Sequence, residues 1–387
     1  MTSSLQSSII PLISTFRAAQ EKAAKSLAAG PEAARYNQSV RSRRGRQTQP
    51  RIVAVGTAVP ENLYTQQQLL DMGGRGRLRE KLFLNSDIDS RHLYFPPEYR
   101  GLESIDEMQG RARRGAAELG GAAIRSCLER ASAAPRDIGF LATATCTVTL
   151  CPHLDTWFIR DLEMSPSIRR AHIGDTGCAA AMVALQAAWN HQHAYPGQKS
   201  VVAAVEVCSA ALYRDGTVEA AVGEAIFGDG AAALCLAWEG AGFEVLGHRT
   251  LIRSEHIGLT GFDFPDGRRR LVLSKEVPAV GAVVLEELVA SLLEEYGVEK
   301  SAVRFWILHS AGRKVLDVAR ERLGLSEDDL RFSRDVFRTC GNMSSPTVLF
   351  VLDRVMASGQ PQPGDIAVMA AMGAGFAAEA ALLRWVE

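Results

Sequence analysis

Cys178 has the type and position expected of a catalytic nucleophile. It follows the polar turn 174–176 and opens a long alanine-rich stretch that is typical of a buried helix. A helix N-terminus favours negative charge, so we expect the thiolate to be stabilised here and the sulfur to be nucleophilic. Farther along the chain, His309 ends an apolar run and Asn342 opens a second apolar stretch. These two residues are the partners that a reactive thiol would need.

A cysteine, a histidine and an asparagine together suit acyl transfer followed by carbon–carbon bond formation. The thiolate takes an acyl group from a thioester and then receives a carbanion. Decarboxylation of a malonyl thioester generates that carbanion as an enolate, and a histidine Nε2 and an asparagine amide can donate hydrogen bonds to its oxygen. We also expect His309 to pair with Cys178 and hold it as a thiolate.

Each of these residues also has a simpler explanation. A lone cysteine in an apolar segment is usually a small core residue, and an asparagine often does no more than cap a helix. Two other groups suggest metal ligands, namely His191 with His193 and Cys151 with His153, but neither has a second ligand pair at zinc spacing. The sequence therefore predicts no metal site, and the context must decide the rest.

Composition narrows the class of protein. A chain of 387 residues that is 47% hydrophobic can bury a substantial core, and its formal net charge of −1 gives no general attraction to nucleic acid or to an anionic membrane. No apolar stretch reaches the roughly 20 residues that a membrane-spanning helix needs. The seven cysteines include no CxxC pair, which favours a reducing compartment. We therefore expect a cytoplasmic protein that binds neither nucleic acid nor membrane.

The elements that must position these residues alternate along the chain. Residues 1–48, rich in serine and alanine and then basic, are interpreted as an N-terminal extension that is flexible or partly helical. From residue 51 onward, short apolar strands alternate with longer helices, which is typical of α/β layering. The predicted strands are 52–55, 140–145, 200–207, 231–237, 305–309 and 366–371, and the predicted helices are 111–132, 179–190, 280–295, 314–322 and 345–357.

Two weak internal similarities suggest a duplication. Cys178 and Asn342 each open an apolar helix, and the segment 228–233 is similar to 373–378. We therefore predict two similar halves, an N-terminal one at 49–240 that carries the cysteine and a C-terminal one at 241–387 that carries the histidine and the asparagine.

Five segments together resemble one family, the type III polyketide synthases, which are chalcone synthase-like enzymes of the thiolase superfamily. The segments are GCAAAMVAL (177–185), EAIFGDGAAA (224–233), FWILHSAGRKVLD (305–317), GNMSSPTVLFVLD (341–353) and MGAGFAAE (372–379). Their order and spacing are compatible with the family over residues 51–387. The resemblance implies the thiolase fold, a duplicated αβαβα architecture of five layers.

The resemblance also implies roles for individual residues. Cys178 is expected to carry the acyl group, with His309 and Asn342 as the decarboxylation and oxyanion pair and Phe227 as the aromatic gatekeeper. The expected pocket residues are Cys146, Ala211, Leu271, Gly223 and Ser344. CoA is expected to bind near Lys81, Gly312 and Lys314, with Arg79 and Arg313 as further candidates for its phosphates.

Departures from the plant pattern indicate a bacterial branch. The family's usual His-Pro-Gly-Gly is here HSAG (309–312), and this segment together with FLNSDIDSRHLYFPPE (83–98) looks most like the branch that makes 3,5-dihydroxyphenylacetyl-CoA from malonyl-CoA. Ala211 and Leu271 stand where plant enzymes often have larger or different side chains. A pocket enlarged there would favour a longer starter or chain, which argues against a malonyl starter.

The resemblance implies malonyl-CoA and an acyl-CoA starter as substrates, no cofactor, and a homodimer. Other bacterial products of the type III kind, an alkylpyrone, an alkylresorcinol or a naphthol, stay open as alternatives. A second alternative is a condensing enzyme similar to β-ketoacyl synthase III. A third, from another class, is a catalytically silent scaffold that binds acyl-CoA, which the complete set of Cys178, His309 and Asn342 argues against.

Overall fold

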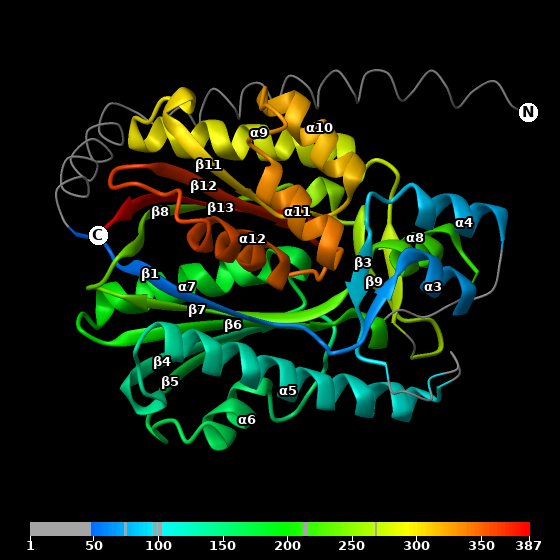
Figure 1. The fold of residues 1–387 in the computed structure, drawn as a ribbon, viewed down its shortest axis with the longest axis horizontal. Coiled ribbons are helices and arrows are strands. Elements are labelled where there is room, and N and C mark those ends of the chain that lie inside the picture. Colours follow the sequence, from blue (N-terminus) through cyan, green and yellow to red (C-terminus); the bar gives the residue numbers. More distant parts are fainter. Residues whose placement is uncertain (1–47, 73–75, 96–98, 100–102, 212–215, 268) are drawn as a thin grey trace, which may run out of the picture. The chain divides into compact units, whose positions relative to one another are not determined.

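A computed structural model describes residues 48–72, 76–95, 99, 103–211, 216–267 and 269–387 (Figure 1). The predicted N-terminal extension therefore lies outside the described residues, except for residue 48. The strands are β1 (Arg51–Ala58), β2 (Leu63–Thr65), β3 (Ser90–His92), β4 (Ile138–Thr145), β5 (Arg169–Gly174), β6 (Lys199–Val207), β7 (Asp229–Ala237), β8 (Gly242–Ile252), β9 (Thr260–Asp263), β10 (Arg270–Leu273), β11 (Val303–Leu308), β12 (Ile366–Gly373) and β13 (Ala377–Val386). The helices are α3 (Gln66–Met72), α4 (Arg77–Leu84), α5 (Ile105–Arg130), α6 (Leu154–Asp161), α7 (Ala180–Ala194), α8 (Val218–Ile226), α9 (Val277–Tyr296), α10 (Arg313–Leu323), α11 (Arg331–Cys340) and α12 (Pro346–Ala357).

The main sheet repeats one strand pattern twice. Its order is β11-β12-β13-β8-β1-β7-β6-β4-β5. In the N-terminal part β4 pairs parallel with β6, and β6 and β7 continue antiparallel to β1. In the C-terminal part β11 pairs parallel with β12, and β12 and β13 continue antiparallel to β8. Strands β4, β6, β7 and β1 thus correspond to β11, β12, β13 and β8, which is the predicted duplication.

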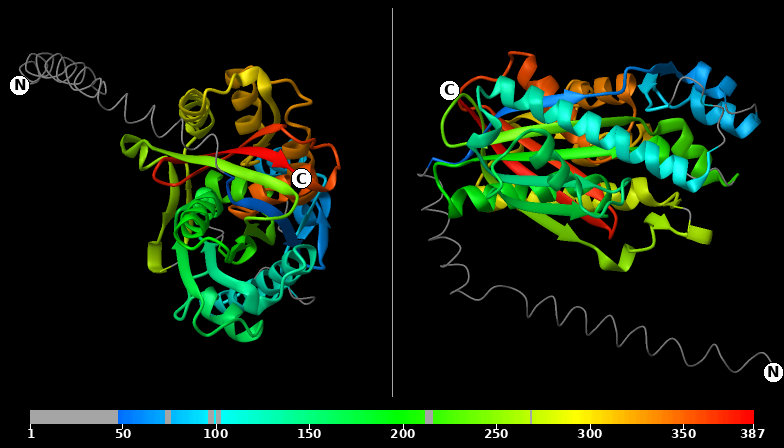
Figure 2. Two further views of the ribbon diagram at one scale, coloured as in Figure 1. Left: turned by 90° about the vertical axis from the view of Figure 1, so that its left-hand side faces the viewer. Right: turned by 90° about the horizontal axis from the view of Figure 1, so that it is seen from below.

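Five layers follow from this pairing (Figure 1). Helices α9 and α10 cover the outer face of the C-terminal strands, α5 and α6 cover the outer face of the N-terminal strands, and α7 and α12 lie between the two sets of strands. Three buried apolar clusters fill the spaces between these layers. The end-on view shows the same stacking, with the yellow helices on one side and the cyan helix on the other (Figure 2). The predicted αβαβα architecture is confirmed.

Small side chains allow the central layer to form. Helix α7 buries alanines on the faces that meet both sets of strands. An alanine side chain requires little separation between a helix and a sheet, so a layer enclosed on both sides can still pack densely. Strand β7 is buried along its whole length, which is typical of a strand covered on both faces.

All six predicted strands and all five predicted helices lie where expected, with shifts at their ends. Two long strands that join the halves, β8 and β13, were not predicted from the sequence. Strand β13 has the sequence AAEAALLRWV, whose residues favour helices, and its pairing on both edges overrides that preference. The division of the chain into two halves at residue 240 stays a prediction. Strands β1 and β8, which belong to different halves, pair with each other, so that one continuous sheet spans both halves.

A smaller unit adjoins one end of the sheet. Strands β2 and β3 pair antiparallel, and α3 and α4 pack with them around their own apolar cluster (Figure 1). We call residues Leu63–His92 the cap. None of the described helices is both long enough and apolar enough to cross a bilayer.

Candidate active site

Cys178 lies in a short 3₁₀ turn, Gly177–Ala179, directly before α7. We call residues 175–179 the Cys turn. Gly177 has a φ of 65°, which favours glycine. The end of β12 passes so close that a Cβ on Gly373 would lie 2.3 Å from the carbonyl oxygen of Thr176. The glycine-rich segment after β12 therefore fixes the position of the Cys turn from the other half of the molecule.

The thiol of Cys178 is protonated in this environment. Burial raises its pKa to about 11, a hydrogen bond with Ser344 lowers the pKa in part, and the charge of Glu206 raises it. The expected thiolate at a helix N-terminus is therefore wrong for the site without substrate. The reason is that desolvation disfavours the charged form of the sulfur, although Cys178 is partly exposed.

Ser344 and Glu206 join Cys178 to a buried polar network. The hydroxyl of Ser344 lies 3.3 Å from the sulfur of Cys146, and that sulfur lies 3.4 Å from Oε1 of Glu206. Glu206 also accepts hydrogen bonds from the hydroxyls of Thr147, at 2.6 Å, and Ser345, at 2.7 Å. Burial raises the pKa of its carboxyl group. The network places two predicted pocket residues, Cys146 and Ser344, beside the nucleophile.

Glu206 was not predicted from the sequence. Its only sequence signal is weak, namely that it is the one carboxylate in the apolar run 201–207, and its complete burial is a property of the structure. Acidic residues are almost never fully buried unless they are paired or hydrogen-bonded.

Hydrogen bonds hold both the backbone and the side chain of Asn342. Its backbone N–H donates to the Ile226 carbonyl at 2.8 Å, and its carbonyl accepts from the N–H of Gly228 at 2.9 Å, so that it pairs with Phe227 as a short parallel bridge. Its Nδ2 donates to the Ala311 carbonyl at 3.1 Å and its Oδ1 accepts from the Ser344 N–H at 2.7 Å. Among the described residues no second acceptor binds Nδ2, so its other hydrogen can donate to a ligand. We call residues 341–345 the Asn turn.

His309 follows β11 and is buried, with 4% of its surface exposed. Its backbone N–H donates to the Ala370 carbonyl at 2.9 Å, but neither ring nitrogen has a hydrogen-bond partner among the described residues. Desolvation lowers the pKa of the imidazole to about 4, so the ring is neutral. No hydrogen bond joins His309 to Cys178 among the described residues, so the expected pairing of His309 with a thiolate is absent there. The Ala311 carbonyl, two residues on, connects His309 to Asn342.

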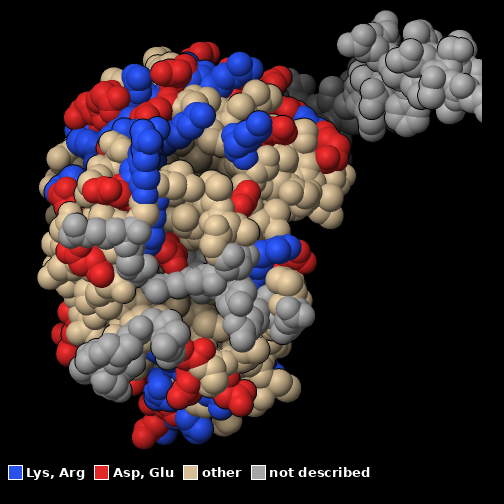
Figure 3. All heavy atoms as spheres, turned by 90° about the vertical axis from the view of Figure 1, so that its right-hand side faces the viewer, with Lys and Arg blue, Asp and Glu red and all other residues tan. Residues whose placement is uncertain are grey.

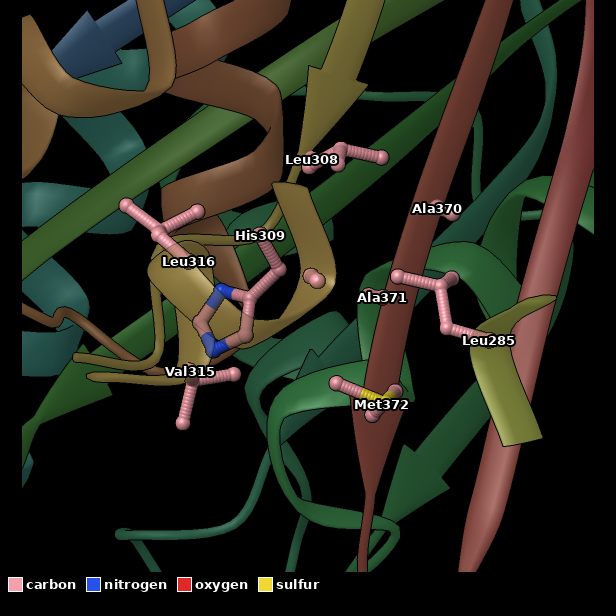
Figure 4. Close-up of a pocket in the computed structure, with 9 residues that line it drawn as sticks. Leu285, Leu308, His309, Val315, Leu316, Ala370, Ala371 and Met372 are labelled. Atoms are coloured by element: carbon pink, nitrogen blue, oxygen red, sulfur yellow. The ribbon is translucent and has the colours of Figure 1, made fainter. Parts of the chain in front are cut away.

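The His309 ring borders a small apolar cavity (Figure 4). Side chains from α9, α10 and β12 line the cavity, including Leu285, Leu316 and Met372. Apolar walls explain why the imidazole is neutral, since they cannot solvate a cation. A neutral imidazole still carries one N–H donor, which is what stabilising an enolate oxygen requires.

The remaining predicted pocket residues are buried on neighbouring elements. Gly223 lies on α8, which packs against β10, the strand that carries Leu271. Ala211 follows a 3₁₀ turn that begins at Cys208 and is also buried. Electrostatic coupling of Cys208 to Cys146 and Cys178 places this turn near the nucleophile.

The predicted CoA contacts lie at the surface. Lys81 on α4 and Lys314 on α10 are exposed, and Gly312 precedes α10 in extended backbone. An ion pair of 3.5 Å between Arg313 and Asp87 joins the start of α10 to the segment after α4. Lysine and arginine side chains gather on the upper part of this face (Figure 3).

Arg79 is a weaker candidate for CoA phosphates than expected. Its guanidinium pairs with Glu224 at 3.0 Å and donates to the carbonyls of Leu69 and Leu70. These bonds hold the side chain between the cap and α8. Among the described residues, no group of three or more histidine, cysteine or acidic side chains could hold a metal ion; the absence of a metal stays a prediction.

Two family models match the chain. Residues 55–243 match the FAE1/type III polyketide synthase-like protein model, and residues 293–385 match the C-terminal model of 3-oxoacyl-[acyl-carrier-protein] synthase III. Together they span the Cys turn, His309 and the Asn turn.

Individual proteins are similar over nearly the whole chain. A 3,5-dihydroxyphenylacetyl-CoA synthase from Streptomyces toyocaensis is 36% identical over 351 residues, covering 87% of this chain and 90% of the relative. A 1,3,6,8-tetrahydroxynaphthalene synthase from Streptomyces peucetius subsp. caesius is 30% identical, covering 86% and 93%. The crystal structure of the 1,3,6,8-tetrahydroxynaphthalene synthase from Streptomyces coelicolor A3(2) superposes with a TM-score of 0.82 at 26% identity, covering 87% of this chain and 99% of the other.

Proposed function

The chain belongs to the type III polyketide synthase family of acyltransferases, and from this premise we propose that it makes 3,5-dihydroxyphenylacetyl-CoA from malonyl-CoA with Cys178 as the acyl carrier. The family and the reaction class rest on the matched models and the 36% identical relative. The product rests on that relative's name and on the motif in the cap. The roles of the residues rest on the geometry of the site.

In the first step Cys178 takes the starter. Its sulfur attacks the thioester carbonyl, a new carbon–sulfur bond forms, and CoA leaves as a thiol that carries the proton from Cys178. Because the resting thiol is neutral, with a pKa of about 11, a base must accept this proton during the attack. We assign this transfer to His309, whose neutral ring has no hydrogen-bond partner among the described residues and must come within reach of the sulfur when substrate binds, with CoA sulfur as the final acceptor.

In the second step malonyl-CoA loses carbon dioxide. The electron pair of the broken carbon–carbon bond moves onto the thioester oxygen and forms an enolate. His309 and the free Nδ2 hydrogen of Asn342 donate to that oxygen. The enolate carbon then attacks the acyl group on Cys178, and the cysteine sulfur leaves as a thiolate that takes one proton from water, so that the lengthened chain is carried by CoA. Transfer of this chain back to Cys178 allows further condensations, and cyclisation of the completed chain forms the ring.

The observation that carries this proposal is the bridge between Phe227 and Asn342. It places an aromatic ring and an amide donor, far apart in the sequence, on neighbouring backbone. The Ser344 N–H fixes which end of the amide is the acceptor, at 2.7 Å from Oδ1. A backbone bridge that sets the starting points of an aromatic side chain and of an oriented amide suits a site that must bind a malonyl group and exclude water.

We further propose that CoA enters across the surface that carries Lys81, Gly312 and Lys314, and that the enzyme is a cytoplasmic homodimer without a cofactor. Exposed lysines suit phosphate groups, and α4 and α10 are joined by the Arg313–Asp87 pair. Light scattering on the purified protein tests the dimer, and replacing Lys81 and Lys314 by glutamine should raise the KM for malonyl-CoA.

The product is tested by incubating the purified enzyme with malonyl-CoA alone and analysing the mixture by mass spectrometry. We expect 3,5-dihydroxyphenylacetyl-CoA, which retains the CoA group. Exclusive formation of a free naphthol or pyrone, or no product until another acyl-CoA is added, would overturn the proposed product while leaving the family unchanged.

Tetrahydroxynaphthalene is the second candidate product, because the 30% identical relative bears that name and because Ala211 and Leu271 suggest an enlarged pocket. The C-terminal match to 3-oxoacyl synthase III supports a third reading, a single condensation of two acyl groups. Supplying acyl groups on acyl carrier protein instead of CoA separates that reading. Turnover only with the carrier protein would favour it.

A further inference from the structure

The cap meets the Phe227–Asn342 bridge through one buried side chain, Arg91. Its exposed fraction is 1%. Its Nη1 donates to the Phe227 carbonyl at 2.6 Å, and its Nε donates to Oε1 of Gln66 at 3.0 Å. The bridge itself uses the Ile226 carbonyl and the Gly228 N–H. The backbone of Phe227 is therefore held by Asn342 on one side and by Arg91 on the other.

The aliphatic part of Arg91 packs against the residue before Asn342. Gly341 has a φ of 69°, and a Cβ placed there would lie 2.7 Å from Cδ and 2.9 Å from Cγ of Arg91. Gly341 is thus required both by its backbone conformation and by the arginine that fills the space beside it. One side chain therefore contacts both strands of the bridge, at Phe227 and at Gly341.

Gln66 supports the same contact. Its Nε2 donates to the Ala225 carbonyl at 2.8 Å, two residues before Phe227, and to the hydroxyl of Ser86 at 2.7 Å. Gln66 and Arg91 thus bind the cap to the segment 225–227 at two points. Neither residue belongs to the main sheet.

Burying the positive charge of Arg91 carries a desolvation penalty. No carboxylate lies within ion-pair distance among the described residues, and its Nη2 has no hydrogen-bond partner there. Burial lowers its pKa to about 9, while the charges of Asp229 and Glu224 at longer range raise it. The side chain is therefore still a cation at neutral pH. An apolar side chain would avoid the desolvation penalty but could not supply fixed donors in one plane.

We propose that Arg91 is a positioning residue for malonyl decarboxylation, acting by fixing the bridge that orients the Phe227 ring and the Asn342 amide. The inference rests on the proposed function, since it assigns these two groups to the decarboxylation step. Among the described residues Arg91 forms no hydrogen bond with the Cys turn, so we expect loading of Cys178 to depend on it much less than decarboxylation does. Displacing a reacting group by about 1 Å can cost roughly a hundredfold in rate.

The test compares two rates in the full-length enzyme. Loading is followed by intact-protein mass spectrometry with an acyl-CoA, and decarboxylation by release of labelled carbon dioxide from malonyl-CoA. For Arg91→Lys we expect decarboxylation to fall roughly tenfold or more in kcat, with loading within about twofold of wild type, because lysine keeps the charge but loses the planar pair of donors. Gln66→Met should change the ratio of the two rates in the same direction but less.

Gln192→Met is the matched control. Gln192 is fully buried and its Nε2 donates to the Leu236 carbonyl, but it lies toward the far end of α7. Its variant should not change the ratio of decarboxylation to loading. If Arg91→Lys does not fold, the ratio in Gln66→Met decides.

Equal loss of both rates, or no loss of either, would overturn the positioning role. The ratio does not depend on which final product forms. If instead the wild type loads Cys178 but releases no carbon dioxide, the proposed function fails and is recognised before any variant is compared.

Discussion

The Cys turn and the Asn turn occupy equivalent places in the two halves, yet different kinds of contact hold them in position. Helices α7 and α12 both lie in the central layer and precede the corresponding strands β6 and β12. The Cys turn is positioned by the close approach of Gly373, and its thiol has a hydrogen bond with Ser344. The Asn turn is fixed by two backbone and two side-chain hydrogen bonds of Asn342.

This difference matches two chemical tasks. A nucleophile must exchange its proton for an acyl group and later release that group, so strong fixed partners would hinder it. A donor to a developing negative charge performs best when its direction is set before the reaction. The duplicated fold thus supplies two similar helix starts. One carries a thiol that has few hydrogen bonds and can exchange its proton, and the other is held rigid by four hydrogen bonds.

The largest effect is expected when the nucleophile of the Cys turn, Cys178, is removed. Cys178→Ala should abolish acyl loading and all product formation, measured by intact-protein mass spectrometry, because no other group can carry the acyl chain. Cys235→Ala, at a fully buried site on β7, is the control and should retain both. Condensation by Cys178→Ala would disprove the covalent mechanism.

Variants of the oxyanion donors should lose decarboxylation rather than the capacity to carry an acyl group. Asn342→Ala and His309→Ala should each slow decarboxylation by roughly 10²- to 10³-fold, the usual cost of one oxyanion donor. For Asn342→Ala we expect loading of Cys178 to persist, which gives an acyl-enzyme that accumulates. Asn85→Ala, an exposed asparagine that caps α4, is the control. Decarboxylation at the wild-type rate in Asn342→Ala would end the distinction between the turns.

The protonation state of the Cys turn has its own test. Below a pKa of about 11 the thiolate fraction rises about tenfold per pH unit, so iodoacetamide labelling of Cys178 should keep increasing from pH 7 to pH 10. Peptide mass spectrometry reports the rate at this cysteine alone. A plateau below pH 8 would instead indicate a stabilised thiolate, and the turn would then be reactive at rest.

The glycine contact tests how the Cys turn is positioned. In Gly373→Ala the new methyl group would meet the Thr176 carbonyl, so we expect a loss of about 1–3 kcal/mol in the free energy of unfolding and slower loading. Denaturant titration and the loading assay measure the two effects. Gly258→Ala, where a Cβ meets no atom within 4 Å, should change neither. Unchanged loading in Gly373→Ala would show that the turn does not need this contact.

The smallest effect is expected beside the Asn turn. Gly312 follows the Ala311 carbonyl that binds Asn342, and a Cβ there would meet no atom within 4 Å. Gly312→Ala should leave the free energy of unfolding within about 0.5 kcal/mol of wild type. A rise of a few-fold in the KM for malonyl-CoA is expected if the pantetheine arm passes this residue. Steady-state kinetics measure that rise, and an unchanged KM would remove Gly312 from the CoA path.

Much of the fold could be predicted because its signal is local. Runs of apolar residues broken by glycine or polar turns revealed β4, β6, β7, β11 and β12, and periodic apolar positions revealed the helices around them. Strand β13 was missed because its alanine, leucine and glutamate favour a helix in isolation. Its state depends on β12 and β8, which lie on either side of it in the sheet.

The residues of the site also differ in whether the sequence alone reveals them. Residues in distinctive motifs, such as Cys178 and Asn342, could be singled out from the sequence. Glu206 and Arg91 could not, since a carboxylate in a strand and an arginine in a short polar segment acquire meaning only through burial and through partners distant in the chain.

The sequence by itself determined the family, the order of the elements and the residues able to do chemistry, because motifs and periodicity are properties of neighbouring positions. The tertiary structure decided the charge states and the orientations. Desolvation disfavours the charged forms of the Cys178 thiol and the His309 ring, whereas helix position alone predicted a thiolate. The bridge to Phe227 and the carbonyl of Ala311 aim the Asn342 amide. Desolvation and hydrogen-bond direction depend on atoms that only folding brings together.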